Sequence, residues 1–300
     1  MDYTIVVENL CKRYGDVQAV DGLSFTVESG EFFGILGPNG AGKTTTMEII
    51  EGLREADSGA VSLLGASPWP RKPSLLIRIG VQLQASSFFE LMTAKEQIYT
   101  FAEMYGVPTS RADAMLETVG LLDSADTRAE QLSGGQAQRL SIACALVHDP
   151  EVVFLDEPTS GLDPQARRNL WDVLRAINDE GRTVVLTTHY MDEAEILCDR
   201  VAIVDRGQLL QLGPPAELVR GLDSPVRISI ESGLLTVPEA KALADDAEVA
   251  DDEVSLTIAT RSPSTVLATL ADRDALRGLQ VRGATLEDVF LHLTGREYRE

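Results

Sequence analysis

The chain has 300 residues, of which 44% are hydrophobic and 24% charged, and its formal net charge is −21. This length can supply the core of one large domain or of two, and the acidity argues against a general nucleic-acid-binding surface. No apolar run approaches the roughly eighteen residues of a membrane span, and the N-terminus lacks a secretory pattern, so we expect a cytoplasmic protein. The three cysteines are too scattered for a disulfide framework or a metal site.

The N-terminal region predicts two strands, at residues 4–8 and 23–27, where apolar and polar residues alternate. Tyr14 lies between them. By spacing alone, its ring could fold back over a bound nucleotide base or pack as an ordinary surface aromatic.

A glycine-rich loop follows the apolar strand at residues 32–36 and precedes a helix. It matches the phosphate-binding pattern G-x-x-x-x-G-K-[ST]. Its members are Gly37, Pro38, Asn39, Gly40, Ala41, Gly42, Lys43, Thr44 and Thr45. The glycines let backbone N–H groups turn toward an anion, and the helix that starts near Gly42 directs its positive end to the same place. Lys43 then reaches the β- and γ-phosphates, and the Thr44 hydroxyl completes a Mg²⁺ shell.

Two more strands are predicted at residues 60–65 and 79–84, and the second ends in Gln84. A polar residue at the end of an internal strand can be a ligand contact or purely structural. From residue 86 to residue 131 the pattern becomes helical, with a capping box at Thr93 and amphipathic helices at 93–105 and 110–119. We expect a helical insertion between strands of the sheet.

The next helix opens on a second glycine-rich segment, which ends the helical insertion. Its residues are Leu132, Ser133, Gly134, Gly135 and Gln136. A serine and two glycines at a helix N-terminus form either a second anion site or an ordinary N-cap.

An apolar strand then runs into two acids, Asp156 and Glu157. Such a strand is buried on both faces and carries its carboxylates to the edge of a parallel sheet, where the phosphate loop also lies. Asp156 is placed to hold Mg²⁺ and Glu157 to orient or deprotonate an attacking water, the alternative being two solvated loop acids.

Asp163 suits the N-cap of the following helix. A further buried strand at 183–188 ends at His189, which is either structural or functional.

Together these motifs resemble the ATP-binding subunit of an ABC transporter, over roughly residues 3 to 220. The most specific piece is the run Leu-Ser-Gly-Gly-Gln at 132–136. The resemblance implies an α/β phosphate-loop NTPase cassette at 1–220, with a mixed sheet, an antiparallel β subdomain and a helical subdomain at about 86–134. Residues 221–300 are expected to form a small C-terminal α+β domain with a structural, dimer-stabilising or regulatory role.

The resemblance also implies roles for single residues. Tyr14 matches the aromatic that stacks on adenine, and Gln84, rather than Gln82, matches the glutamine that contacts Mg²⁺ and senses the γ-phosphate. Glu157 resembles the catalytic base and His189 the γ-phosphate contact that positions it. Further nucleotide contacts across the subunit interface are implied for the segment Ser133, Gly134, Gly135 and Gln136, and for Asp163.

The function implied is hydrolysis of MgATP in a two-fold homodimer that drives a separately encoded membrane permease from the inner face of the membrane. The segments at residues 187–203 and 284–295 resemble the drug and antibiotic exporter branch, similar to daunorubicin-resistance ATPases. The alternatives are a soluble ABC ATPase that acts on ribosomes or DNA and a non-catalytic nucleotide-binding regulator. The first fits poorly because the chain has one cassette, no long coiled coil and an acidic composition.

Overall fold

The computed structural model of the chain describes residues 3–82, 88–89, 91–252 and 254–295. The chain divides into two compact units whose boundary falls between Pro215 and Ala216. In the described residues, no helix combines the length and the apolar character needed to cross a membrane. We call the first unit the cassette and the second the accessory unit.

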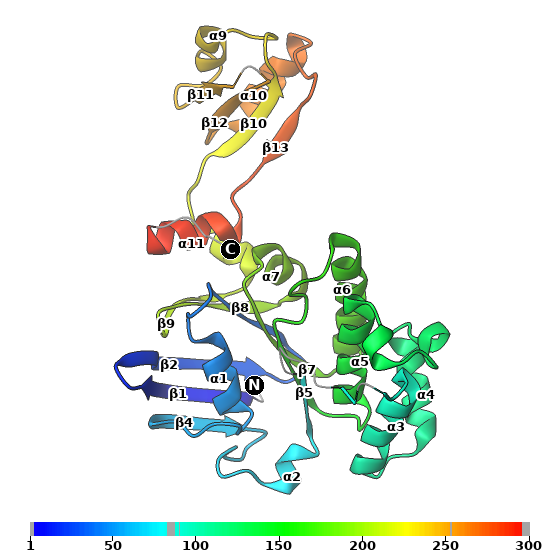
Figure 1. Ribbon diagram of the computed structural model, residues 1–300. Helices are drawn as coiled ribbons and strands as arrows, with labels where there is room; N and C mark the ends of the chain where they lie inside the picture. Colours follow the sequence, from blue (N-terminus) through cyan, green and yellow to red (C-terminus); the bar gives the residue numbers. More distant parts are fainter. Residues whose placement is uncertain (1–2, 83–87, 90, 253, 296–300) are drawn as a thin grey trace. The chain divides into compact units, whose positions relative to one another are not determined.

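The centre of the cassette is a six-stranded mixed sheet (Figure 1). Its strands, in spatial order, are β5 (Ile79–Gln82), β6 (Val152–Asp156), β7 (Thr183–Thr188), β3 (Phe32–Leu36), β8 (Arg200–Asp205) and β9 (Gln208–Gly213). All neighbouring pairs are parallel except β8 and β9. Every residue of β3, β6 and β7 is buried, as expected for parallel strands covered on both faces. The residues that follow these strands therefore meet at one edge of the sheet.

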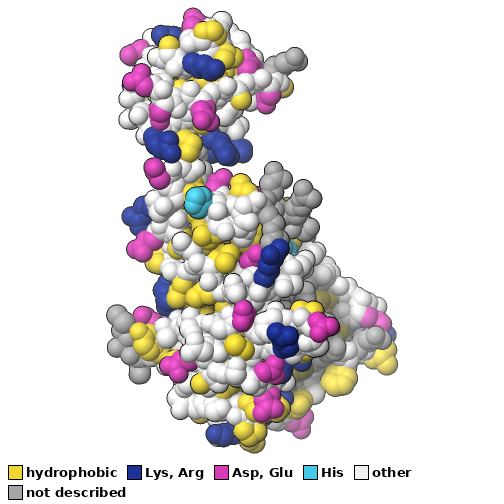
Figure 2. Space-filling model, turned by 90° about the vertical axis from the view of Figure 1, so that its left-hand side faces the viewer, with side chains coloured by type: hydrophobic (Ala, Val, Ile, Leu, Met, Phe, Trp, Pro, Cys, Tyr) yellow, Lys and Arg dark blue, Asp and Glu magenta, His cyan; other side chains and the backbone are white. Residues whose placement is uncertain are grey.

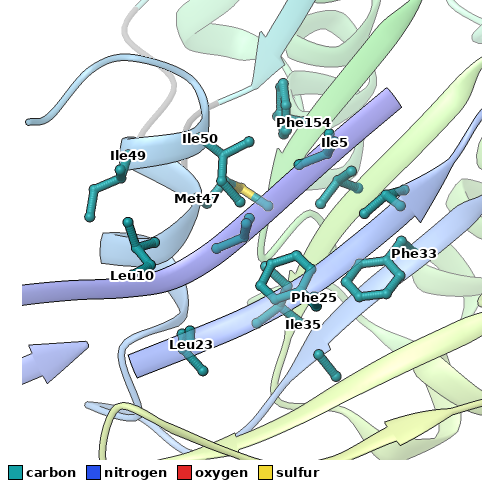
Figure 3. Close-up of a cluster of buried hydrophobic side chains, with 14 of the residues drawn as sticks. Ile5, Leu10, Leu23, Phe25, Phe33, Ile35, Met47, Ile49, Ile50 and Phe154 are labelled. Carbon is teal, nitrogen blue, oxygen red and sulfur yellow. The ribbon is translucent and has the colours of Figure 1, made fainter. Parts of the chain in front are cut away.

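A second sheet of the cassette is antiparallel and has three strands. They are β2 (Val17–Glu28), β1 (Tyr3–Tyr14) and β4 (Ser58–Leu63). Helix α1 (Lys43–Ile50) contributes Met47 and Ile50 to the core that also holds Ile5 of β1 (Figure 3). In the same core Phe25 and Phe33 stack across the two sheets with their ring centroids 5.3 Å apart. This packing fixes the helix that carries the phosphate loop.

The expected helical insertion is present. It contains α3 (Ala94–Tyr105), α4 (Thr109–Thr118), η1 (Leu122–Ser124), η2 (Ala129–Gln131) and α5 (Gly134–Leu146). The capping box predicted at Thr93 is confirmed, because its hydroxyl accepts from the Glu96 N–H and the Glu96 carboxylate accepts from the Thr93 N–H. The remaining cassette helices are α2 (Pro73–Leu76), α6 (Pro164–Asp179) and α7 (Met191–Leu197).

The accessory unit has a β-α-β-β-α-β core, the order of a ferredoxin-like split βαβ fold. Its elements are β10 (Val226–Glu231), α9 (Val237–Lys241), β11 (Glu248–Asp251), β12 (Ser255–Thr260), α10 (Pro263–Asp272) and β13 (Gln280–Arg282), with α8 (Pro215–Arg220) before and α11 (Leu286–Thr294) after them. The strands are antiparallel in the order β11-β12-β10-β13. Alternate residues, such as Ile228 and Ile258, face the two core helices.

Some elements were missed or misjudged from the sequence. Strands β1 and β2 are much longer than the expected runs at 4–8 and 23–27, because bulges carry the pairing through polar stretches. Strand β11 was missed since Glu248 and Asp251 are poor strand formers held in place by β12.

Candidate active site

The phosphate loop connects β3 to α1, and two of its glycines are required by their surroundings. Gly42 has φ 100°, and a Cβ there would lie 2.2 Å from the Ala19 carbonyl oxygen. A Cβ on Gly37 would lie 2.2 Å from the Val204 carbonyl oxygen. Asn39 and Gly40 are exposed. The loop is therefore held tightly at both ends and open at its tip.

Lys43 is the first residue of α1, and its side chain is 4% exposed. The ammonium donates to the carbonyl oxygens of Gly37, at 2.9 Å, and Pro38, at 3.2 Å. Its Nζ is also 3.1 Å from Oε1 of Glu157. These contacts match the three donors of an ammonium, so Lys43 bridges the loop and the carboxyl end of β6.

Asp156, the last residue of β6, lies beside the start of α1. Its Oδ1 accepts from the Thr44 hydroxyl at 3.2 Å and from the Thr187 hydroxyl of β7. Burial raises the pKa of Asp156, while the two hydroxyls and the nearby Lys43 lower it. A cation next to this carboxyl would favour its charged form.

Glu157 follows directly and has φ 47°, an uncommon conformation for a residue with a side chain. Its N–H donates to the hydroxyl oxygen of Thr187 at 3.0 Å and to the carbonyl oxygen of the same residue at 3.2 Å. Its Oε2 is 3.2 Å from Nδ1 of His189, without hydrogen-bond geometry, and its side chain is 8% exposed. The turn thus aims one carboxylate at both Lys43 and His189.

Tyr14 ends β1 and is 39% exposed. Two cations flank its ring, with Nζ of Lys12 at 5.9 Å and Cζ of Arg54 at 5.2 Å from the centroid. The ring is accessible enough to stack on a base, and the same geometry also suits a surface aromatic.

The segment Ser133–Gln136 lies at the N-terminus of α5. The Ser133 hydroxyl accepts from the Gln136 N–H at 3.3 Å, and the Gln136 side chain accepts from the Ser133 N–H at 2.9 Å. Ser133 and Gly134 are exposed, so the helix end is capped and still open to another molecule. Asp163 is the exposed N-cap of α6, as predicted, and its Oδ1 accepts from the N–H groups of Gln165 and Ala166.

The structure brings Lys43, Thr44, Asp156, Glu157 and His189 together. Gln84 lies outside the described residues, whereas Gln82, the rejected alternative, is a buried residue of β5.

Sequence reasoning missed Thr187, which binds both Asp156 and Glu157. The signal that could have found it is strand order, because β6 and β7 pair in parallel and set Asp156 against Thr187. Glu193 was also missed as a buried carboxyl, which accepts from the Trp171 indole at 3.1 Å.

Comparisons with known proteins identify the family. Residues 20–160 match the family model described as ABC transporter. The chain is 40% identical, over 97% of both sequences, to the Nod factor export ATP-binding protein I of Burkholderia lata. It is 37% identical to the linearmycin resistance ATP-binding protein LnrL of Bacillus subtilis, over 98% of this chain and 99% of that protein.

Among solved structures, the dimeric structure of a bacterial ABC transporter cassette superposes with a TM-score of 0.64 and 28% identity, over 70% of this chain and 98% of that one. Likeness over nearly the full length to ATP-binding proteins, together with a phosphate loop facing paired acids, leads to one conclusion. The chain belongs to the ABC transporter family, as an ATP-binding subunit with ATPase activity.

Proposed function

We propose that two copies of this chain bind and hydrolyse MgATP at shared sites and thereby drive a separately encoded permease that exports a hydrophobic drug, antibiotic or similar compound. The observation that carries the proposal is the meeting of Lys43 and Glu157 at 3.1 Å where the phosphate loop faces the end of β6. A cationic phosphate ligand and a buried carboxylate are what ATP hydrolysis requires at one place.

In this proposal the backbone N–H groups of the phosphate loop hold the phosphates, and Tyr14 stacks on adenine. Lys43 exchanges its contact with Glu157 for one with a phosphate oxygen, since its other two donors serve the loop itself. The exchange releases the Glu157 carboxylate to accept a proton from water. His189, whose Nδ1 is 3.2 Å from that carboxylate, holds the γ-phosphate and the water in line.

Mg²⁺ fits the donor set, because Thr44 and Asp156 present oxygen atoms 3.2 Å apart beside the loop. Mg²⁺ in such sites uses one or two protein oxygens, with phosphate and water as the other ligands. We assign Thr44 and Asp156 as its protein ligands, and Gln84 as a further one by resemblance. Bound there, the ion would neutralise charge on the phosphates.

The N-terminus of α5 supports a site shared between two copies. Ser133 and Gly135 bind the γ-phosphate held by the other copy, and Gly134, Gln136 and Asp163 line the same interface. The exposure of Ser133 and Asp163, together with the dimeric form of a related cassette, supports this arrangement. Hydrolysis removes the shared phosphate contacts and lets the two copies separate.

The permease contact is assigned to the helical insertion. Phe89 is 58% exposed, Leu91 75% and Met104 74%, whereas Phe88 packs against the core of the insertion. Exposed apolar side chains of this kind favour a partner surface.

The proposal places the chain in the cytoplasm, on the inner face of the membrane. The export direction rests on the names of the relatives, one for Nod factor export and one for linearmycin resistance.

Action on ribosomes or DNA is the weaker alternative. On the face shown in Figure 2, acidic and basic side chains are interspersed and no broad basic patch forms. A surface of that kind does not favour phosphate backbones.

Glu157→Gln tests the proposal. We expect ATP turnover to fall at least about a hundredfold, as for loss of a general base, while ATP binding persists. Glu151→Gln is the matched control, because Glu151 directly precedes β6, at the end of the strand opposite to Glu157. Its side chain is 54% exposed and pairs with Arg78. Brisk hydrolysis by Glu157→Gln, or an equal loss in Glu151→Gln, would contradict the assignment of the base.

The permease assignment has a separate test. A crosslinker placed at residue 89 of the full chain should capture the permease, while one placed at the exposed Val254 of the accessory unit measures the background. Equal yields at both positions would contradict the assigned surface.

A further inference from the structure

The ring of Tyr190 packs against the imidazole of His189. Tyr190 follows β7 and is the N-cap residue of α7, and its ring centroid is 4.1 Å from that of His189, with the ring planes at 42°. The Tyr190 N–H donates to the Thr188 hydroxyl at 2.9 Å. The turn that carries His189 is therefore fixed by its backbone on one side and by an aromatic ring on the other.

Arg167 of α6 in turn packs on Tyr190. Its Cζ is 3.8 Å from the Tyr190 ring centroid, a close cation–π stack. Its Nε is buried and has no hydrogen-bond partner, and its ion pair with Asp192 is long, at 3.9 Å. The guanidinium thus stacks on the ring, and its charge also lowers the pKa of the buried Glu193.

Helices α6 and α7 are joined along one seam. Arg167, Trp171 and Arg175 are spaced by four residues and share one face of α6. The Trp171 indole donates to Oε1 of Glu193 at 3.1 Å, and Arg175 donates to the carbonyl oxygen of Ile196 at 3.1 Å. The stack on Tyr190 is the end of this seam that reaches His189.

We propose that Tyr190 and Arg167 are positioning residues for His189, which they hold with its imidazole directed toward Glu157. The inference rests on the role proposed above for His189. The backbone N–H of Arg167 makes the ordinary helical bond to the Asp163 carbonyl oxygen, at 2.9 Å, so the stack also connects His189 to the first turn of α6, which carries Asp163 of the proposed interface. The contacts use the ring of Tyr190, so its hydroxyl is dispensable.

The test compares variants of the full chain by steady-state ATP hydrolysis. Tyr190→Ala and Arg167→Ala should each lower kcat about tenfold or more, since misplacing a catalytic group by about 1 Å can cost a hundredfold. The KM for MgATP should stay within about twofold, because neither residue binds nucleotide. Tyr190→Phe should recover most of the loss, and the double alanine variant should be no worse than the poorer single, since the two residues act as one unit.

Arg175→Ala is the matched control, because it removes an arginine from the same face of α6 that contacts α7 away from His189. Wild-type kcat is expected there. Loss of kcat in Arg175→Ala equal to that in Arg167→Ala, failure of Tyr190→Phe to recover activity, or wild-type kcat in Tyr190→Ala would each overturn the proposal.

Two further measurements keep the outcomes separate. Binding of a fluorescent ATP analogue by Tyr190→Ala in the Glu157→Gln background should be unchanged; lost binding would mean that the stack maintains the fold, and would also overturn the proposal. His189→Ala tests the premise, since wild-type turnover in that variant would remove the role of His189. Wild-type turnover in Tyr190→Ala alongside an inactive His189→Ala would refute only the positioning.

Discussion

The cassette and the accessory unit bury different kinds of side chain. The charged residues that are buried in the described part of the chain all belong to the cassette, and they are Glu31, Lys43, Glu51, Asp156 and Glu193. Among the residues of the accessory unit that the structure describes, the one buried polar side chain is Thr260. Burying charge is costly unless it is paired, so a fold keeps it mainly where chemistry or specific anchoring needs it.

Sheet architecture accounts for the difference. In the cassette, parallel strands covered on both faces bring the residues after β3, β6 and β7 to one edge, where Lys43, Glu157 and His189 meet. In the accessory unit, antiparallel strands alternate between an apolar face toward two helices and a polar face, which needs no buried charge. We therefore expect substitutions at the buried charges of the cassette to impair ATP binding and hydrolysis. Substitutions in the core of the accessory unit should instead lower the stability of that unit.

The largest effect on ATP binding is expected from Lys43→Met. Loss of a charge-assisted phosphate contact worth about 1.5–3 kcal/mol should weaken ATP binding by roughly ten- to a hundredfold. The variant also leaves Glu157 without its cation, so its Tm should fall and be partly restored by adding Glu157→Gln. Lys241→Met, at an exposed lysine of the accessory unit, is the control for titration calorimetry and melting. Equal ATP affinity in the two variants would contradict the assignment of Lys43 as a phosphate ligand.

Leu256→Ala should lower the stability of the accessory unit and leave ATP turnover nearly unchanged. Leu256 is fully buried in the core of the accessory unit, so truncation should cost about 2–5 kcal/mol of that unit's stability. Turnover per folded chain at saturating ATP should change less than about twofold. A collapse of turnover while the cassette stays folded would show that the accessory unit contributes to the reaction.

The smallest effect is a pH dependence at Glu193. Burial raises its pKa above the ordinary value, against the opposing effects of Thr188, Thr159 and Trp171. The folded state therefore holds this proton more tightly than the unfolded chain, so stability should fall as pH rises from the unfolded pKa of about 4.5 toward the raised value.

Glu193→Gln removes this titration while keeping an acceptor for the Trp171 indole. Melting curves should show the variant gaining in Tm relative to wild type as pH increases from 4 to 8. A constant difference in Tm across that range would rule out the buried titration.

The sequence predicted the parts of the site that are local motifs. The phosphate loop, the capped helix at Ser133 and the acids after β6 each depend on neighbours within a few residues, and the strand order of the family then brings them together. What it could not predict were contacts between distant elements, such as the Thr187 hydroxyl on Asp156, Arg167 on Tyr190 and Trp171 on Glu193. These depend on strand register and on the crossing of α6 and α7.

We propose that each ATP is enclosed by the phosphate loop of one copy and the α5 N-terminus of another. Light scattering on the Glu157→Gln chain with MgATP tests it most directly, with and without Ser133→Arg, a bulky change at an exposed N-cap. We predict that Glu157→Gln becomes a dimer in MgATP, and that the double variant still binds ATP but remains a monomer. A double variant that dimerises as readily as Glu157→Gln would contradict the shared site.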